Sequence, residues 1–224
     1  VDTNDQWIRE RTGIEERRIA PEGMNSSYMA TEAAKKAMQM ANVTAEEIDM
    51  NIFAPLKPDM IIPSAACVLQ ANLGAKNAAA YDLQAACSGF VYGLITAASY
   101  ISSGIYKKVL VVGAEILSRR VNWNDRGTCI LFGDGAGAAV VSEVPEGYGI
   151  KGFDMGADGT GGSALCIPAG GTAEVANDRR VEEGLTFIHM DGPEVYKFAV
   201  KTMGRTVLRS VERADMELNE LDYF

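Results

Sequence analysis

The chain has 224 residues, nearly half of them apolar, and a formal net charge of -9 with a single histidine. This length allows one large domain or two small ones, and the apolar share is sufficient for a packed core. The acidic balance argues against non-specific nucleic-acid binding, which needs a basic surface, although a local basic patch is compatible with it.

Cysteines and apolar segments set two further limits. The four cysteines, at positions 67, 87, 129 and 166, form no CxxC pair and no metal-ligand spacing with His189, so we expect no metal site and free thiols in a reducing cytoplasm. The longest apolar run, around residues 87–101, contains small and polar residues and predicts a buried helix rather than a membrane span. The chain begins without Met and stops in the apolar residues LDYF, so we expect a segment of a longer protein.

Up to residue 115 the predicted elements alternate between helices and strands. Ser26 and Ser27 can cap a helix that runs to about Ala41, and Thr44 with Glu47 forms a capping-box pattern. Then follow a strand over residues 50–56, a helix over 64–73, a strand over 77–83, a helix from about 87 to 103, and a strand over 107–115. This alternation predicts an α/β layered fold with a largely parallel sheet.

The segment CILFGDGAGAAVVSEV, residues 129–144, interrupts the alternation because two apolar runs flank a glycine turn. We favour an antiparallel β-hairpin that starts a strand at Cys129 and has Asp134 in its turn. A phosphate-binding glycine loop is the alternative, but the β-branched residues that follow offer no helix to receive a phosphate.

Residues 145–149 are typical of a linker, after which the pattern starts again. We expect a strand from residue 149, a glycine-rich and charged loop over residues 160–184, and a long helix that begins at Gly192 and Pro193. The final LDYF would open another strand. We therefore expect the second unit to be cut off after one strand and one long helix, at the start of the next strand.

Cys87 lies where the strand over residues 77–83 passes into a helix. Unpaired N–H groups at a helix start stabilise a thiolate, small neighbours leave room for a substrate, and the N–H of Cys87 itself is placed to donate to an oxyanion. Strand–turn–helix contexts of this kind expose nucleophiles in α/β folds. The alternative is a packed core thiol, because cysteine is among the most buried residue types. None of the other three cysteines has this context.

His189 is the candidate base for a nucleophilic cysteine, because such a cysteine usually needs one and the chain has no other histidine. It precedes the helix that begins at Gly192. The alternative is a loop or strand-end histidine without a catalytic duty.

Four segments together resemble one enzyme family. They are VDTNDQWIRERTGIEERRIA at the start, AACSGFVYGL around Cys87, DRGTCILFGDGAGAAVV in the middle and MDGPEVYKFAV near the end. In this order, along nearly the whole chain, they resemble β-ketoacyl-acyl-carrier-protein synthase III, the initiating condensing enzyme of bacterial fatty acid synthesis.

The resemblance implies a thiolase-like fold, in which two similar α/β halves form a layered α-β-α-β-α sandwich in a homodimer. Residues 1–145 would form a nearly complete first half with the nucleophile and the CoA-site residues, and residues 146–224 the truncated start of the second half. It also implies a cytoplasmic enzyme that has no tightly bound cofactor, uses acyl-CoA as a substrate, and binds neither membrane nor nucleic acid.

The resemblance further implies a two-step reaction at Cys87. An acetyl-type acyl group passes from acyl-CoA to the thiolate. Malonyl-acyl-carrier protein then loses carbon dioxide and condenses with that group to give 3-oxoacyl-acyl-carrier protein. The family's decarboxylating His and Asn would lie beyond Phe224, and His189 does not match that histidine, so we expect residues 1–224 alone to be inactive in condensation.

Matching positions imply a site for the CoA nucleotide. Trp7 matches the tryptophan that stacks on the adenine, and Arg11 and Arg126 match the arginines around the nucleotide. Thr3 matches a neighbouring polar contact. Without the resemblance, Trp7 would be a half-exposed anchor and the two arginines solvated charges.

Three further positions are assigned in the same way. Gly192 lies in the loop that lines the pantetheine channel, and the neighbouring Pro193 replaces a polar residue of the family pattern. Lys197 matches a basic residue on the face that docks the acidic carrier protein. Ile62 stands where many members place a phenylalanine in the acyl pocket, contributed across the dimer, and an aliphatic residue there would admit a different starter.

Two other interpretations stay open. One is a non-catalytic thiolase-fold fragment that acts in binding or assembly. The other is a related acyl-CoA condensing enzyme, of the polyketide-starter or hydroxymethylglutaryl-CoA synthase type. An acyl adduct on Cys87 would separate the enzymes from the binding module.

Overall fold

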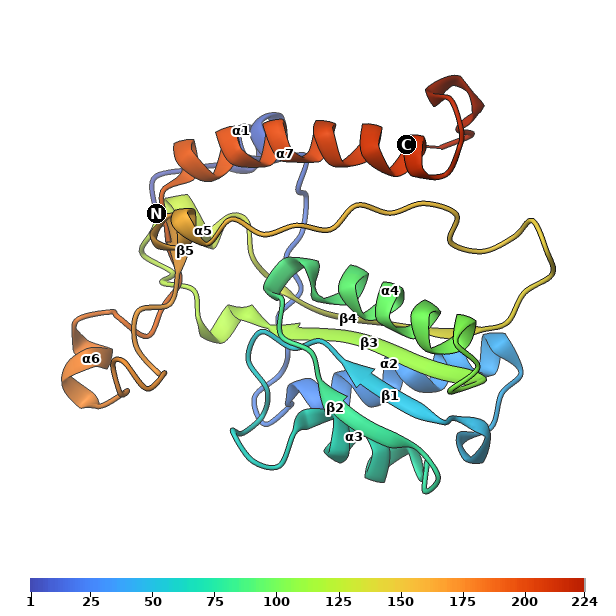
Figure 1. Ribbon diagram of the computed structural model, residues 1–224. Coiled ribbons are helices and arrows are strands. Elements are labelled where there is room, and N and C mark those ends of the chain that lie inside the picture. The colour runs from blue at the N-terminus through green and yellow to red at the C-terminus, as the bar shows by residue number, and fades with distance from the viewer. Residues whose placement is uncertain (224) are drawn as a thin grey trace. The chain divides into compact units, whose positions relative to one another are not determined.

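The computed structural model describes residues 1–223 and divides them into two compact units, which are described separately (Figure 1). The sheet unit consists of Arg18–Ile116 and Asp134–Ile150. The α7 unit consists of Val1–Arg17, Leu117–Gly133 and the chain from Lys151 onward. These units interleave along the chain, whereas the predicted thiolase-like halves, residues 1–145 and 146–224, follow one another. That division into halves stays a prediction.

The four-stranded sheet of the sheet unit is largely parallel, as predicted. Its order is β2-β1-β3-β4, and β1 pairs in parallel with β2 and β3, whereas β4 pairs antiparallel with β3. The central strands are mostly buried on both faces, which explains their continuous apolar sequences. The strands are β1 (Met50–Phe53), β2 (Ala79–Asp82), β3 (Lys108–Ile116) and β4 (Asp134–Ser142).

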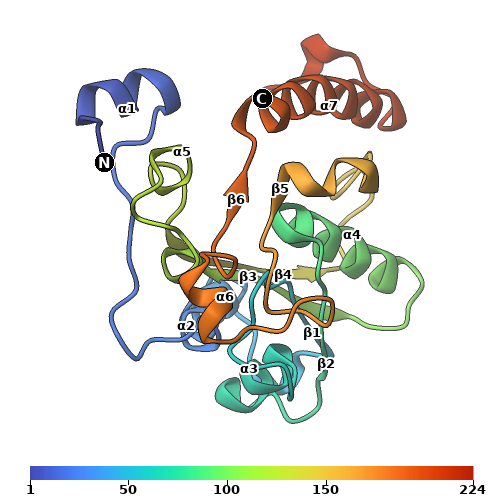
Figure 2. The ribbon, with the colours of Figure 1, turned by 90° about the vertical axis from the view of Figure 1, so that its left-hand side faces the viewer.

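Helices cover both faces of this sheet (Figure 1, Figure 2). On one face lie α2 (Ser26–Ala41) and α3 (Ala65–Leu73), and on the other lies α4 (Gly89–Ser102). Successive side chains of a strand point to opposite faces, so Val112 enters the core under α2 and α3, whereas Val111 enters the core under α4.

Side-chain caps determine where the helices of this unit begin. Asn25 caps α2, rather than the predicted Ser26 or Ser27, because its side chain accepts the backbone N–H three residues further on at 3.0 Å. The helix predicted over residues 64–73 is α3, and Ser64, which was expected to be its first residue, is its N-terminal cap. The predicted capping box of Thr44–Glu47 is present at the 3-10 turn that follows α2.

The predicted hairpin over residues 129–144 is wrong. Cys129 ends a short helix instead of starting a strand, and β4 pairs along its whole length with β3. Gly135 and Gly137 therefore lie inside a strand, and Asp134 is the first residue of that strand rather than a turn residue. The strand β3 is the better partner, because it offers nine residues for pairing and the short apolar run before the glycines does not.

The α7 unit combines short elements with one long helix, which begins at Gly192 as predicted and is capped by Asp191. Its core contains Ile8, Val121 and Ile188. No helix in residues 1–223 has the length and apolar character needed to cross a membrane. The elements are α1 (Asp5–Thr12), α5 (Arg126–Cys129), β5 (Leu165–Cys166), α6 (Asp178–Glu182), β6 (His189–Met190), α7 (Gly192–Arg213) and 3-10 turns at Leu117–Arg119, Gly159–Ala164 and Leu218–Glu220.

The strand predicted from residue 149 does not form, and the chain stays irregular up to the turn that begins at Gly159. This segment is held by α7 instead of by a sheet. A Cβ added at Gly152 would lie 2.2 Å from the carbonyl oxygen of Ser210, and the Asp154 carboxylate pairs with Arg213 at 2.8 Å. The predicted final strand is also absent over residues 221–223, and its last residue lies outside the described residues.

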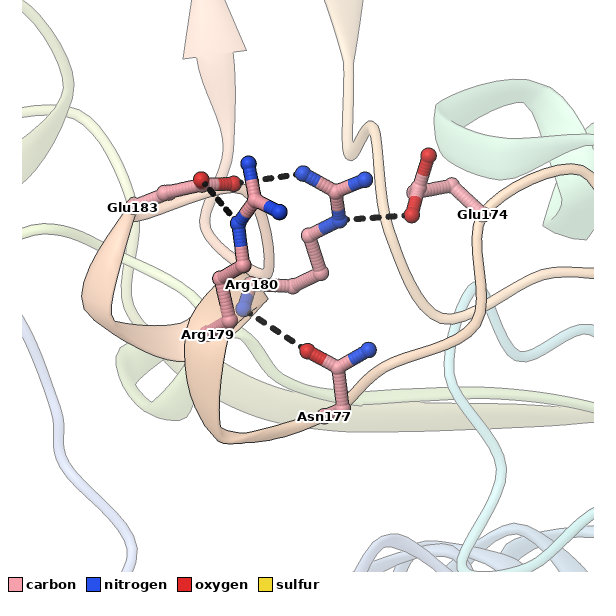
Figure 3. A network of polar contacts seen from close by, with 5 residues as sticks. All are labelled: Glu174, Asn177, Arg179, Arg180 and Glu183. Carbon is pink, nitrogen blue, oxygen red and sulfur yellow. Dashed lines mark hydrogen bonds and ion pairs between the residues drawn. The ribbon is translucent and has the colours of Figure 1, made fainter.

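A charged network fixes the loop that leads into α6 (Figure 3). The guanidinium of Arg180 donates to Glu174 and to Glu183, both at 2.6 Å, and Arg179 donates to Glu183 at 2.8 Å. Asn177 caps the helix through its side-chain oxygen. Each pair is partly exposed and contributes little alone, but together they order a segment that was predicted to be a plain loop.

Candidate functional site

Cys87 lies in a tight turn between β2 and α4, which confirms the strand–turn–helix context. The turn is the 3-10 segment Ala86–Ser88, and Ala86 has a φ of 46°, a left-handed conformation that is uncommon for a residue with a Cβ. The thiol is free and exposed. Within residues 1–223 the backbone N–H of Cys87 has no hydrogen-bond partner, so it is available as a donor.

Two glycines fix the start of α4 against the sheet. A Cβ added at Gly89 would lie 3.0 Å from the Cβ of Ala54, and one added at Gly93 would lie 2.8 Å from a methyl group of Val111. Both distances are too short for a side chain, so the helix can approach the strands only because these residues are glycine. Gly89 and Gly93 therefore place the turn that carries Cys87.

Asp82, the last residue of β2, connects the strand before Cys87 to α3. Its two carboxylate oxygens accept the N–H groups of Ala65 at 2.9 Å and Ala66 at 2.7 Å, at the start of that helix. The sequence analysis did not predict this contact. Although Asp82 is visibly an acidic residue at a strand end, its partners precede it in the chain and belong to another element.

Glu115 is a second carboxylate that the sequence analysis missed, near the carboxyl end of β3. One oxygen accepts the N–H of Leu56, and the other is buried without a partner among the described residues. Burial raises the pKa of Glu115 to about 7, against the opposing effect of the backbone N–H groups of Leu56 and Lys57. Desolvation is therefore the dominant influence on this carboxyl group.

The other cysteines lack the combination found at Cys87; Cys67 is also exposed, but its backbone N–H already donates to the Ser64 hydroxyl. Cys67 lies in the first turn of α3 and accepts a hydrogen bond from the Ser64 hydroxyl at 3.1 Å. Cys129 is buried in the core of the α7 unit, and Cys166 lies in β5. No group of three or more potential metal ligands occurs among residues 1–223.

Trp7, Arg11 and Arg126 form a cluster on the α7 unit. The guanidinium carbons of Arg11 and Arg126 lie 5.3 Å and 5.0 Å from the centre of the Trp7 ring, within the range of cation–π attraction. Arg126 also donates to the carbonyl oxygen of Asp2 at 3.0 Å. The fold thus brings together an aromatic ring and two positive charges from α1 and α5, two helices that are far apart in the sequence.

The remaining predicted site residues are placed as follows. The hydroxyl of Thr3 is buried and has no partner among the described residues. Gly192 starts α7, and Lys197 is exposed on that helix. Ile62 is 82% exposed in the segment between β1 and α3 of the sheet unit. His189 lies in the two-residue strand β6, and its Nε2 lies 3.1 Å from the carbonyl oxygen of Gly184.

Comparisons with known proteins decide the family. The family model of 3-oxoacyl-[acyl-carrier-protein] synthase III matches residues 81–159, which include Cys87. The β-ketoacyl-[acyl-carrier-protein] synthase III of Caldanaerobacter subterraneus is 53% identical over 222 residues, which cover 99% of this chain and 67% of that protein. This chain belongs to the β-ketoacyl-acyl-carrier-protein synthase III family.

Solved structures agree with this membership in the synthase III family of condensing enzymes. The crystal structure of 3-oxoacyl-[acyl-carrier-protein] synthase III from Aquifex aeolicus VF5 has a TM-score of 0.86 and 44% identity, covering 98% of this chain and 66% of that one. The priming β-ketosynthase of the R1128 polyketide pathway has a TM-score of 0.85 and 33% identity, covering 98% and 65%. The thiolase-like α/β fold is therefore confirmed. The chain spans about two thirds of the length of these relatives.

Proposed function

We propose that the protein catalyses the initiating condensation of fatty acid synthesis, with Cys87 as the residue that carries the acyl group. The observation that supports this most directly is the turn at Cys87, where an exposed thiol follows a left-handed residue and lies beside a free backbone N–H. Membership in the synthase III family supports the reaction class.

In the first half-reaction, the Cys87 thiolate attacks the carbonyl carbon of an acyl-CoA thioester. The backbone N–H of Cys87 donates to the developing oxyanion. As the tetrahedral intermediate collapses, the bond to the CoA sulfur breaks, and CoA leaves as a thiolate that takes up a proton. The acyl group then remains on Cys87 as a thioester.

In the second half-reaction, malonyl-acyl-carrier protein loses carbon dioxide, and the electron pair left on its α-carbon attacks the Cys87 thioester. The Cys87 thiolate leaves, which restores the enzyme, and 3-oxoacyl-acyl-carrier protein is released. Each cycle thus consumes one acyl-CoA and one malonyl group and yields CoA and carbon dioxide.

The Trp7 cluster suits the nucleotide end of CoA. The Trp7 ring offers a face for the adenine, and the guanidinium groups of Arg11 and Arg126 offer positive charge for the phosphates. The unpartnered hydroxyl of Thr3 supports a further polar contact. Gly192 is assigned to the pantetheine channel on the resemblance alone.

Two exposed residues are assigned to the partners of the reaction. Lys197 on α7 suits an acidic carrier protein, and the exposed Ile62 suits an acyl pocket completed across a homodimer. We place the enzyme in the cytoplasm. The two thiolase-like halves, residues 1–145 and 146–224, belong to the same proposal.

Acylation of Cys87 tests the function. The protein in its natural length is incubated with acetyl-CoA, and the mass of the peptide that contains Cys87 is measured. We expect an added acetyl group that is absent from Cys87→Ala. A folded wild-type protein that gains no adduct would refute the enzyme and favour a thiolase-fold binding module.

A related condensing enzyme is the second candidate, because the priming β-ketosynthase of the R1128 polyketide pathway has nearly the same structural similarity. The carrier protein of the second half-reaction separates the two. Condensation with the malonyl-acyl-carrier protein of fatty acid synthesis supports fatty acid initiation, whereas condensation with a polyketide carrier protein alone supports a polyketide-type priming enzyme.

A further inference from the structure

The side chain of Glu115 accepts a backbone N–H group at the point where the pairing between β1 and β3 ends. Backbone pairing with β3 continues for one residue past the end of β1, because the N–H of Ala54 donates to the carbonyl of Val112 at 2.8 Å. Two residues later this pattern ends, and Leu56 donates its N–H to the side chain of Glu115. The carboxylate thus holds the segment Ala54–Leu56 beyond the end of the ladder.

This segment, together with Phe53 before it, contacts the residues on both sides of the Cys87 turn. On the strand side, Leu83 donates its N–H to the carbonyl of Phe53 at 2.7 Å, and the Gln84 amide approaches the carbonyl of Leu56 at 3.4 Å. On the helix side, Gly89 packs on Ala54. The backbone of Leu56 is therefore held on both sides. Its N–H donates to Glu115, and its carbonyl accepts from Gln84, three residues before Cys87.

A carboxylate at this position opposes stability. One of its oxygens is buried without a partner, and no charged side chain is among its contacts in the described chain. Its raised pKa, about 7, has the same cause, which is desolvation. A group that reduces stability and also braces a reactive turn is typical of a residue retained for function.

Asp49 provides the contrast at the opposite end of the same sheet. Its carboxylate accepts the N–H groups of Lys107 and Lys108 at 2.8 Å and 2.9 Å, at the start of β3. It therefore braces a strand end as Glu115 does, but at the amino end of β1 and away from the carboxyl ends of the strands, where Cys87 lies.

We propose that Glu115 is a positioning residue for the nucleophile. It fixes the segment Ala54–Leu56, and that segment fixes the turn that orients the thiol and the N–H of Cys87. The inference rests on the proposed function of Cys87. Glu115 itself touches neither the substrate nor the reacting atoms.

The test compares Glu115→Leu, which removes the acceptor but fills the space, with Glu115→Gln, which keeps an acceptor without the charge. In the protein of natural length, we expect Glu115→Leu to slow single-turnover acylation of Cys87 by about 10- to 100-fold, the scale of a small misplacement of reacting groups. Acyl-CoA affinity should stay unchanged, and Glu115→Gln should restore most of the rate. Asp49→Leu, the matched control, should lose stability and keep the wild-type rate.

Two results overturn the proposal: acylation of Glu115→Leu at the wild-type rate, or equal slowing in Asp49→Leu. Absence of an adduct in the wild type would instead refute the function of Cys87. Hydrogen exchange of the backbone amides of residues 84–89 then decides the role of Glu115 by itself. Faster exchange in Glu115→Leu but not in Asp49→Leu supports positioning, and equal exchange in both variants and the wild type overturns it.

Discussion

The Cys87 turn and the Trp7 cluster are built in opposite ways. The turn depends on backbone conformation and on buried packing, with a left-handed Ala86 and with glycines pressed against the strands. The cluster depends on partly exposed side chains that meet above a small core. Substitutions near the turn should therefore act on folding and on the chemistry of Cys87 together, whereas substitutions in the cluster should act on acyl-CoA binding and leave the chemistry of Cys87 unchanged.

Gly93→Val should have the largest effect, because its new side chain would overlap Val111, which already lies 2.8 Å from the position of an added Cβ. We expect a loss of roughly 3 kcal/mol in the free energy of unfolding, the upper range for overpacking. Urea denaturation measures it. Gly204→Ala in α7 is the control, because no atom lies within 4 Å of its added Cβ and the replacement favours a helix. A comparable loss in both variants would contradict the packing explanation.

Trp7→Ala should weaken acyl-CoA binding, in addition to the stability lost because Trp7 packs against the core of the α7 unit. The loss of a stacking face is worth about 1–3 kcal/mol, so we expect the KM for acetyl-CoA to rise about 5- to 150-fold. A short acyl thioester that lacks the nucleotide should acylate Cys87 at the wild-type rate. Trp123→Ala is the control, because it also removes an indole ring, one that is 45% exposed and donates to the carbonyl of Ser118. Equal losses with both substrates would place Trp7 in the chemistry instead.

Asn51→Leu should make the sheet unit more stable. Asn51 is fully buried in β1, and neither its side-chain oxygen nor its nitrogen has a hydrogen-bond partner among the described residues. An apolar side chain of the same branching removes this desolvation cost, so we expect a gain of about 1–2 kcal/mol. Thermal unfolding measures the gain. A lower melting temperature than that of the wild type would indicate that a bound water satisfies Asn51.

Glu115→Gln should change how stability depends on pH. The folded-state pKa of Glu115 is about 7, against an ordinary value of 4.5, so between these values the folded protein binds more protons than the unfolded chain. The stability that the protein has because the Glu115 carboxyl group is protonated is thus full below pH 4.5. It falls as pH rises through this window and is lost above about 7, where the group is ionised. The variant lacks this decline, so its stability relative to wild type should be higher at pH 8 than at pH 5. Parallel curves from urea denaturation at the two pH values would contradict this.

The sequence predicted the sheet unit well where a pattern was local. Continuous apolar runs indicated β1, β2 and β3, and the helix predicted over residues 64–73 agrees with α3 to within one residue. The hairpin prediction failed because Gly135 and Gly137 are typical of turns, and nothing near them in the sequence shows that β3 pairs with them. Strand pairing between distant segments decided that element.

The candidate site shows the same limit. The position of Cys87 between a strand and a helix could be read locally, whereas the approach of Arg126 to Trp7 was expected only from the family resemblance. Glu115 gave no signal, because its partner Leu56 is distant in the sequence and the burial of its second oxygen depends on the whole sheet unit. Contacts that a single side chain makes with residues far away in the sequence could therefore not be predicted from the sequence.

The left-handed Ala86 has a consequence for how this turn can evolve. An alanine in that conformation costs roughly 1 kcal/mol, and glycine would remove the cost. Glycine would also widen the range of conformations open to the peptide before Cys87, so a more stable protein would hold its thiol less firmly. Selection for stability alone therefore favours glycine at this position, and selection for turnover favours a residue with a side chain.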